Sequence, residues 1–136
     1  LEKLDISGEH KEPYNALTQL GSSYLDLVTR PDVVNLNRLL IGEAGRHPQL
    51  SRIFYENGAR QTLIFICNTI ENLMIQGLLR RKDLRTAGLQ FKSLFDAGLV
   101  ERQLWGLDQT PSEEVKAEAV RSAIETFLLA YDNSAD

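Results

Sequence analysis

Two glutamates stand at positions where a helix would place them among apolar side chains. At 100° per residue, Glu71 projects between Ile64 and Leu78. Glu43 lies in the apolar stripe of an earlier helix. A carboxylate in such surroundings is paired with a cation, protonated, or used to bind or transform a molecule.

Each glutamate is open to more than one interpretation. The first is a buried or half-buried ion pair with Arg38, Arg46 or Arg60. The second is a polar group in an otherwise apolar pocket, where a single carboxylate orients a ligand. A third is acid–base catalysis by the two carboxylates together, which requires that they be adjacent in the fold.

The other side chains that commonly do chemistry are few. His10 lies in a polar tail and His47 precedes a proline, and neither belongs to a convincing set of metal ligands at helical spacing. Cys67 lies in the apolar run LIFICNTI, which favours a buried residue over a reactive thiol. The chain has no glycine-rich phosphate loop, nucleophile elbow or HExxH motif. We therefore expect no catalytic residue, no metal site, no cofactor and no enzymatic activity.

Helices alone are expected to position these residues. No long stretch alternates polar and apolar residues, and each proline stands where a helix could begin. The periodicity predicts an all-α bundle of about six helices. Their expected ranges are 12–29, 32–46, 48–56, 59–80, 84–105 and 111–131.

Local signals mark several of the expected helix ends. The run TPSE predicts a capping hydroxyl at Thr110 followed by a proline in the first helical position. Asp83 is expected to cap the helix that follows it. Asn57-Gly58 is expected to end the short helix 48–56.

Composition predicts one acidic domain over residues 1–136. A chain of 136 residues that is 43% hydrophobic can bury one sizeable core. A net charge of -4 without an extended basic run argues against nucleic-acid binding by these residues. The apolar runs are far shorter than a bilayer span and the N-terminus does not resemble a signal peptide, so we expect a cytoplasmic protein without membrane contact.

The predicted central helix, 59–80, is apolar around much of its circumference, so several neighbours should cover it. Inward residues of three helices should converge beside two phenylalanines and form an apolar cavity with one acid and one phenol. Such a cavity suits a small hydrophobic ligand that carries a hydrogen-bond donor or a positive charge. The expected lining residues are Tyr24, Val28, Leu36, Leu40, Ile66, Ile70, Glu71, Met74, Phe91 and Phe95.

The last two predicted helices each carry a second apolar row besides their core face. Such rows, spaced by three or four residues, are typical of helices that meet other helices at close range. Because one small domain cannot cover all of this surface, we expect the rows to meet their copies in a four-helix homodimer interface. The alternative is that the monomer covers both rows. The rows are Leu89, Ser93, Ala97, Val100 and Leu104, and Val115, Ala119, Ser122, Thr126 and Leu129.

The run LNRLLIGEAGRHPQLSRIFYENGARQTL carries a family resemblance. Its Glu-Ala before Arg-His-Pro, its Leu-Ser-Arg and its Phe-Tyr-Glu-x-Gly resemble the C-terminal regulatory domain of TetR-like transcriptional repressors, in particular the AefR-like subgroup. The resemblance continues through GLLRRKDLRTAGLQFKSLF into the final helix and covers roughly residues 12–131.

The resemblance implies an N-terminal helix-turn-helix head joined to a helical domain. In such proteins the domain dimerises through its last two long helices, and the helices ahead of them line a small-molecule pocket. By implication Pro48 to Glu56 is a lever that shifts when a ligand binds. The head is absent here, residues 1–11 look like the tail of an upstream helix, and operator binding cannot be assigned to any residue. The competing hypothesis is a helical homodimer that binds another protein and no small molecule.

Overall fold

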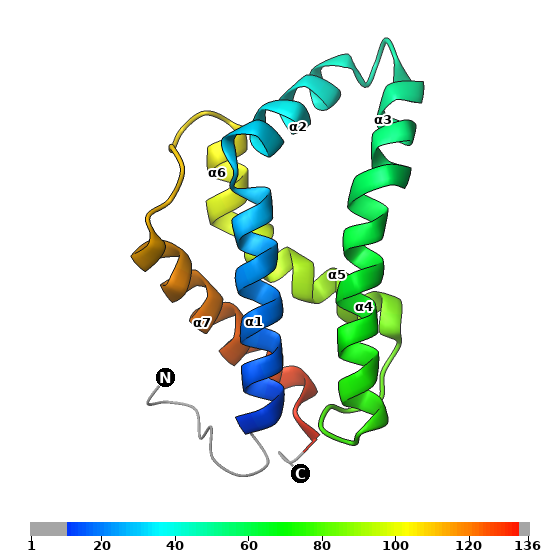
Figure 1. The fold of residues 1–136 in the computed structure, drawn as a ribbon, viewed down its shortest axis with the longest axis vertical. Helices are drawn as coiled ribbons and strands as arrows, with labels where there is room; N and C mark the ends of the chain where they lie inside the picture. The colour runs from blue at the N-terminus through cyan, green and yellow to red at the C-terminus, as the bar shows by residue number, and fades with distance from the viewer. Residues whose placement is uncertain (1–10, 134–136) are drawn as a thin grey trace.

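Helices make up nearly all of the computed structural model, which describes residues 11–133 (Figure 1). The α-helices are α1 Lys11–Val28, α2 Pro31–Glu43, α3 Pro48–Phe54, α4 Arg60–Ile75, α5 Leu84–Phe95, α6 Glu101–Leu104 and α7 Glu113–Tyr131. Two π-type turns, η2 Tyr55–Ala59 and η3 Asp96–Val100, join α3 to α4 and α5 to α6. The prediction of an all-α bundle is confirmed. The predicted tail of an upstream helix lies almost wholly outside the described residues.

The core lies where α1 and α4 meet α5 and α7 (Figure 1). Each of these four helices turns one apolar face inward, as the 3.6-residue period of a buried helix face requires. The most deeply buried large side chains are Leu17 and Leu25 of α1, Ile66 and Ile70 of α4, Phe91 and Phe95 of α5, and Ile124, Phe127 and Leu128 of α7. In the described residues no helix is long and apolar enough to cross a lipid bilayer.

Two glycines bring α5 unusually close to its neighbours. A Cβ atom at Gly21 of α1 would lie 2.4 Å from Cζ of Phe95. A Cβ atom at Gly88 of α5 would lie 2.5 Å from Sγ of Cys67 on α4. Because real Cβ atoms do not approach other atoms so closely, only glycine permits either contact. Cys67 is half-buried in this contact, and its burial raises the pKa of the thiol.

The predicted break at Asn57-Gly58 is wrong. The chain stays helical from Pro48 to Ile75, and the π-type turn absorbs the two residues. The Asn57 side-chain amide donates to the Ile53 carbonyl at 2.7 Å, so the residue serves the helix instead of ending it. The predicted helices 48–56 and 59–80 are therefore one rod, which ends five residues earlier than expected, before Gly77 with its φ of 80°.

The predicted helix 84–105 is broken in the structure. Ala97 has an extended backbone with ψ of 126°, and Gly98 has φ of 86°. A positive φ is accessible to glycine at little cost, so the break falls where the sequence can accommodate it. As a result α6 runs in a different direction from α5, and it lies beside the start of α2 (Figure 1).

The ends of α5 and α7 show one cap as predicted and one displaced. The Asp83 carboxylate accepts from the Thr86 amide at 3.0 Å, which confirms it as the cap of α5. Ser112, not Thr110, caps α7, because its hydroxyl accepts from the Val115 amide at 3.2 Å. The helix consequently begins two residues after the predicted position.

The central position that we predicted for helix 59–80 is not observed. Ile64 and Ile75, both in its apolar arc, are exposed in α4. The helix contacts α5 and α1, whereas α1 contacts α2, α4 and α7 and also meets α5 at Gly21. The helix with neighbours on most sides is therefore α1.

The close contact between α1 and α5 leads to a first prediction. Gly21→Ala places a Cβ against the buried Phe95 ring, which has little room to move. We expect a loss of about 1–3 kcal/mol in the free energy of unfolding, measured by urea titration. The control is Gly42→Ala, because Gly42 is helical and a Cβ there meets nothing within 4 Å. Equal stability of the two variants would contradict the close contact.

Candidate functional site

Six of the ten residues predicted to line a cavity are buried together in the core. They are Tyr24, Ile66, Ile70, Met74, Phe91 and Phe95, and Val28 packs against them from α1. The ring centroids of Phe91 and Phe95 lie 5.0 Å apart, and Tyr24 meets Phe95 edge-on at 6.1 Å. The structure thus brings the predicted residues of α1, α4 and α5 together as a packed cluster.

The predicted lining residues of α2 lie apart from this cluster. Leu36 and Leu40 are half-buried and are not among the residues that pack against the core. The helix is held instead at α6, where the Arg38 guanidinium donates to the carbonyls of Gln103 at 2.6 Å and Leu104 at 2.9 Å. Helix α2 is therefore anchored to α6 near its middle.

An acid and a phenol do meet at the core, but the acid is not Glu71. The Tyr24 hydroxyl donates to Oδ1 of Asp96 at 2.6 Å, and Nζ of Lys92 lies 2.6 Å from Oδ2 of the same carboxylate. Burial and the bond to Asp96 both raise the pKa of Tyr24, so the phenol keeps its proton and donates it. The result is a short polar chain across the α1–α5 contact.

The two glutamates that the sequence places among apolar side chains differ in their partners. Glu43 is paired with Arg46 at 2.5 Å, and Nε2 of His47 lies 3.9 Å from its other oxygen. This confirms the ion-pair interpretation for Glu43. Glu71 is half-buried, and within residues 11–133 neither a hydrogen bond nor an ion pair engages its carboxylate. Over the same residues no three His, Cys, Asp or Glu side chains gather into a possible metal site.

Sequence reasoning missed three polar residues at this site. Lys92 and Asp96 are four residues apart on a predicted helix, which is the spacing of an ion pair and was visible in the sequence. Gln103 is buried, and its amide nitrogen donates to the Thr29 carbonyl at 2.8 Å. Its partner lies 74 residues away in the chain, so no local signal could have revealed it.

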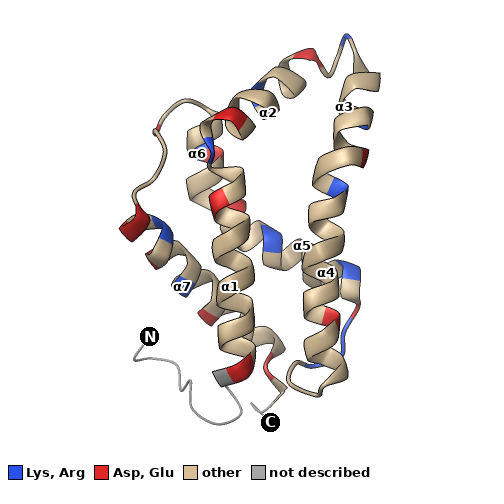
Figure 2. Cartoon of the chain, in the orientation of Figure 1, with Lys and Arg blue, Asp and Glu red and all other residues tan. Residues whose placement is uncertain are grey.

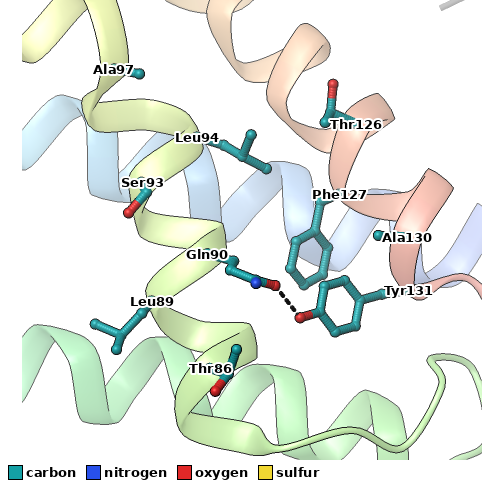
Figure 3. Close-up of a pocket in the computed structure, with 10 residues that line it drawn as sticks. All are labelled: Thr86, Leu89, Gln90, Ser93, Leu94, Ala97, Thr126, Phe127, Ala130 and Tyr131. Atoms are coloured by element: carbon teal, nitrogen blue, oxygen red, sulfur yellow. Dashed lines mark hydrogen bonds between the residues drawn. The ribbon is translucent and has the colours of Figure 1, made fainter.

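The predicted dimer rows flank a groove between α5 and α7 (Figure 3). The groove has a volume of about 540 Å³. Four predicted row residues line it, namely Leu89, Ser93, Ala97 and Thr126. On its floor Tyr131 donates a hydrogen bond to the Gln90 side chain. Leu129, one turn beyond Thr126, is 81% exposed.

The remaining row residues divide into exposed and covered groups. Val115 and Ser122 are exposed on α7. Val100 and Ala119 pack against the core, and Leu104 is half-buried. The break at Gly98 explains part of this division, because residues beyond it no longer continue the row of α5. The monomer therefore covers some of the two rows and leaves the rest open.

A separate apolar surface is open on α2, α3 and the first half of α4. Large apolar side chains there are exposed to between 37% and 62%. They are Leu39, Ile41, Leu50, Ile53, Phe54, Tyr55, Ile64 and Phe65. Many exposed large apolar side chains on neighbouring elements are typical of a surface that binds a ligand or a partner. Figure 2 shows Lys and Arg interspersed with Asp and Glu along the helices, without a basic face in this view.

The chain is similar to a known protein family. The family model for the C-terminal domain of AefR-like transcriptional repressors matches residues 15–133. No curated protein sequence matches the chain. The family match agrees with the resemblance found in the run from Leu36 to Leu63.

Solved structures share the fold. A protein described as a TetR-family transcriptional regulator from Mesorhizobium loti MAFF303099 is 23% identical, with a TM-score of 0.81 over 88% of this chain and 59% of its own. The flavonoid-responsive regulator FrrA is 26% identical, with a TM-score of 0.79 over 98% of this chain and 68% of its own. A TetR transcriptional regulator from Agrobacterium tumefaciens is 26% identical, with a TM-score of 0.78 over 95% of this chain and 64% of its own. The chain spans between 59% and 68% of these proteins.

Among the described residues Glu71 has no bonded partner, whereas Asp83 caps α5, and this difference leads to a second prediction. Glu71→Gln should change the free energy of unfolding by less than about 0.5 kcal/mol, because no described bond is lost. Asp83→Ala is the control, since it removes the carboxylate that caps α5 by accepting from Thr86, and it should cost about 1 kcal/mol. Urea titration of both variants measures the difference. A loss of several kcal/mol in Glu71→Gln would show that this carboxylate has a structural partner.

Proposed function

Because the chain belongs to the family of AefR-like transcriptional repressor C-terminal domains, we propose that it senses a small hydrophobic effector and holds two subunits of a TetR-family regulator together. The observation that carries the proposal is the pair of separate apolar surfaces on one helical core. One lies on α2, α3 and α4, and the other lies on α5 and α7. A domain that only filled its own core would leave neither exposed.

The surface on α2, α3 and α4 is the proposed effector side. Its exposed leucine, isoleucine and aromatic side chains favour a ligand with a large apolar area. Leu36 and Leu40, which the sequence assigned to the lining, are half-buried at its edge and can contact such a ligand as it enters toward Tyr24. We propose that Glu71, which is half-buried on α4, supplies the polar end of the site.

The class of effector follows from the lining and from one relative. A mostly apolar site with a few polar groups suits an aromatic molecule of modest size that carries hydroxyl or amino donors. FrrA, which is 26% identical over 98% of this chain, is named for its response to flavonoids. Flavonoids are flat aromatic molecules with hydroxyl groups, so they belong to the proposed class.

The groove face of α5 and α7 is the proposed subunit interface. In a two-fold dimer the same face meets its copy, so an apolar groove flanked by exposed apolar side chains can be covered by a second chain. The DNA-binding part would lie in the portion of such regulators that this chain does not span. The protein would act in the cytoplasm without catalysing a reaction.

A second candidate function has one observation in its favour. Six predicted lining residues are tightly packed in the core, as expected for a domain without a small-molecule ligand. In that case the surface on α2, α3 and α4 would bind another protein. The response to small molecules separates the two candidates.

The third prediction tests effector binding. We expect at least one compound in a panel of flavonoids and hydrophobic aromatic amines to raise the melting temperature of the 136-residue chain by several degrees, because a ligand that binds the folded state stabilises it. Leu40→Gln should reduce that shift. Leu107→Gln, a change at an exposed leucine between α6 and α7, should preserve it. A panel without any stabilising compound would favour the protein-interaction candidate.

The fourth prediction tests the interface. Ala97→Arg places a charge at the groove and should weaken the dimer at least a hundredfold, as measured by sedimentation equilibrium. Ala117→Arg is the control, because Ala117 is exposed on α7 outside the predicted row. Ala119 is less suitable, since it packs against the core. A wild-type chain that is monomeric at micromolar concentration would overturn the interface.

A further inference from the structure

Helix α1 contacts the end of α5 at Phe95 and Asp96, the two residues directly before the helix break at Ala97 and Gly98. Phe95 lies against Gly21, where a Cβ would come within 2.4 Å of the ring. Asp96 accepts the hydroxyl hydrogen of Tyr24 at 2.6 Å. Gly21 and Tyr24 are three residues apart, so they lie on the same face of α1. One face of α1 therefore fixes the end of α5 by both packing and a hydrogen bond.

The helix changes direction immediately after this contact. Ala97 is extended and Gly98 has φ of 86°, so the backbone leaves helical geometry directly after Asp96. Beyond the break, Gln103 of α6 donates to the Thr29 carbonyl, one residue past the end of α1. The break thus lies between two attachments to the same helix, at Tyr24 and at Thr29.

The Asp96 carboxylate is shared between two neighbours. Tyr24 donates to one oxygen, and the Lys92 ammonium group pairs with the other at 2.6 Å. Lys92 belongs to α5 itself, so its pair follows α5 wherever that helix moves. Tyr24 alone connects the carboxylate to α1. Loss of the Tyr24 bond would leave Asp96 paired and α5 helical, but it would free the break from α1 at this point.

The residue next to Asp96 belongs to the groove. Ala97 lines it together with Ser93, one turn earlier on α5 (Figure 3). Tyr24 is therefore connected to the groove through two adjacent residues, Asp96 and Ala97. Tyr24 itself is buried in the same cluster as Phe91 and Met74, on the core side of α5.

We propose that the hydrogen bond from Tyr24 to Asp96 couples the apolar core to the subunit face by holding the break at Ala97 and Gly98 in one geometry. Asp96 is then a positioning residue, which acts on the groove through Ala97. The inference rests on the proposed function in taking the side of α2, α3 and α4 as the effector side, from which a ligand enters toward Tyr24, and the groove as the subunit interface. It adds the bond through which one side acts on the other.

Hydrogen exchange of the 136-residue chain tests the local part of this proposal. Tyr24→Phe removes only the hydroxyl, and we expect amides between Ala97 and Glu101 to exchange at least about tenfold faster. Tyr14→Phe is the matched control, because Tyr14 is equally buried on α1 and lies ten residues before Tyr24, about three helical turns away. It should leave these amides unchanged.

Two variants of the acceptor Asp96 give a second measurement of the same bond. Asp96→Asn keeps an oxygen that accepts from Tyr24, whereas Asp96→Leu removes it. We expect Asp96→Asn to exchange at the break more slowly than Asp96→Leu. If Tyr24→Phe leaves exchange at the break unchanged, or speeds it in equal measure throughout the chain, the bond is merely stabilising and the proposal is wrong.

Sedimentation of the same variants tests the link to the interface. We expect Tyr24→Phe to change the dimer dissociation constant by about tenfold while Tyr14→Phe does not. A dimer that is indifferent to Tyr24→Phe would overturn the coupling even if the break loosens. If the wild-type chain is a monomer, the proposed interface fails, and the exchange result still decides whether Tyr24 holds the break.

Discussion

The fold depends on how closely α1 can approach α5, and Gly21 sets that distance. Without a Cβ at this position, the Phe95 ring can lie directly against the backbone of α1. The same approach brings Tyr24 within hydrogen-bond distance of Asp96 and places Phe91 in the middle of the aromatic cluster. A larger residue would separate the helices, and the packed core would lose the contacts that hold its two halves together.

The consequences of this contact reach both the core and the groove. On one side α5 presents Phe91 and Phe95 to α1 and α4, and on the other side it presents Leu89 and Ser93 to the groove with α7. We propose that α5, which is buried on one face and lines the groove with the other, passes changes in the core to a second subunit. The break at Gly98 confines this role to α5, because α6 turns away and is tied to α1 and α2.

Sequence periodicity predicted the helices and their core faces because burial alone determines which face is apolar. The cap at Asp83 was also predictable, since capping depends on residues three positions apart. The prediction of a helix end at Asn57-Gly58 was wrong, because a π-type turn can continue a helix across residues that often end one. The partner of Tyr24 could not be predicted, because Asp96 lies 72 residues away and the approach depends on Gly21. Glu71 attracted attention by its position, although Asp96 is the acid that meets the phenol.

We propose that an effector binds on the side of α2, α3 and α4, and not in the groove between α5 and α7. Hydrogen exchange measured with and without the flavonoid or aromatic amine that stabilises the chain most tests this claim directly. We expect exchange to slow most in segments between Pro31 and Ile75, with a smaller change in Glu113–Tyr131. Slower exchange confined to the groove segments of α5 and α7 would contradict it.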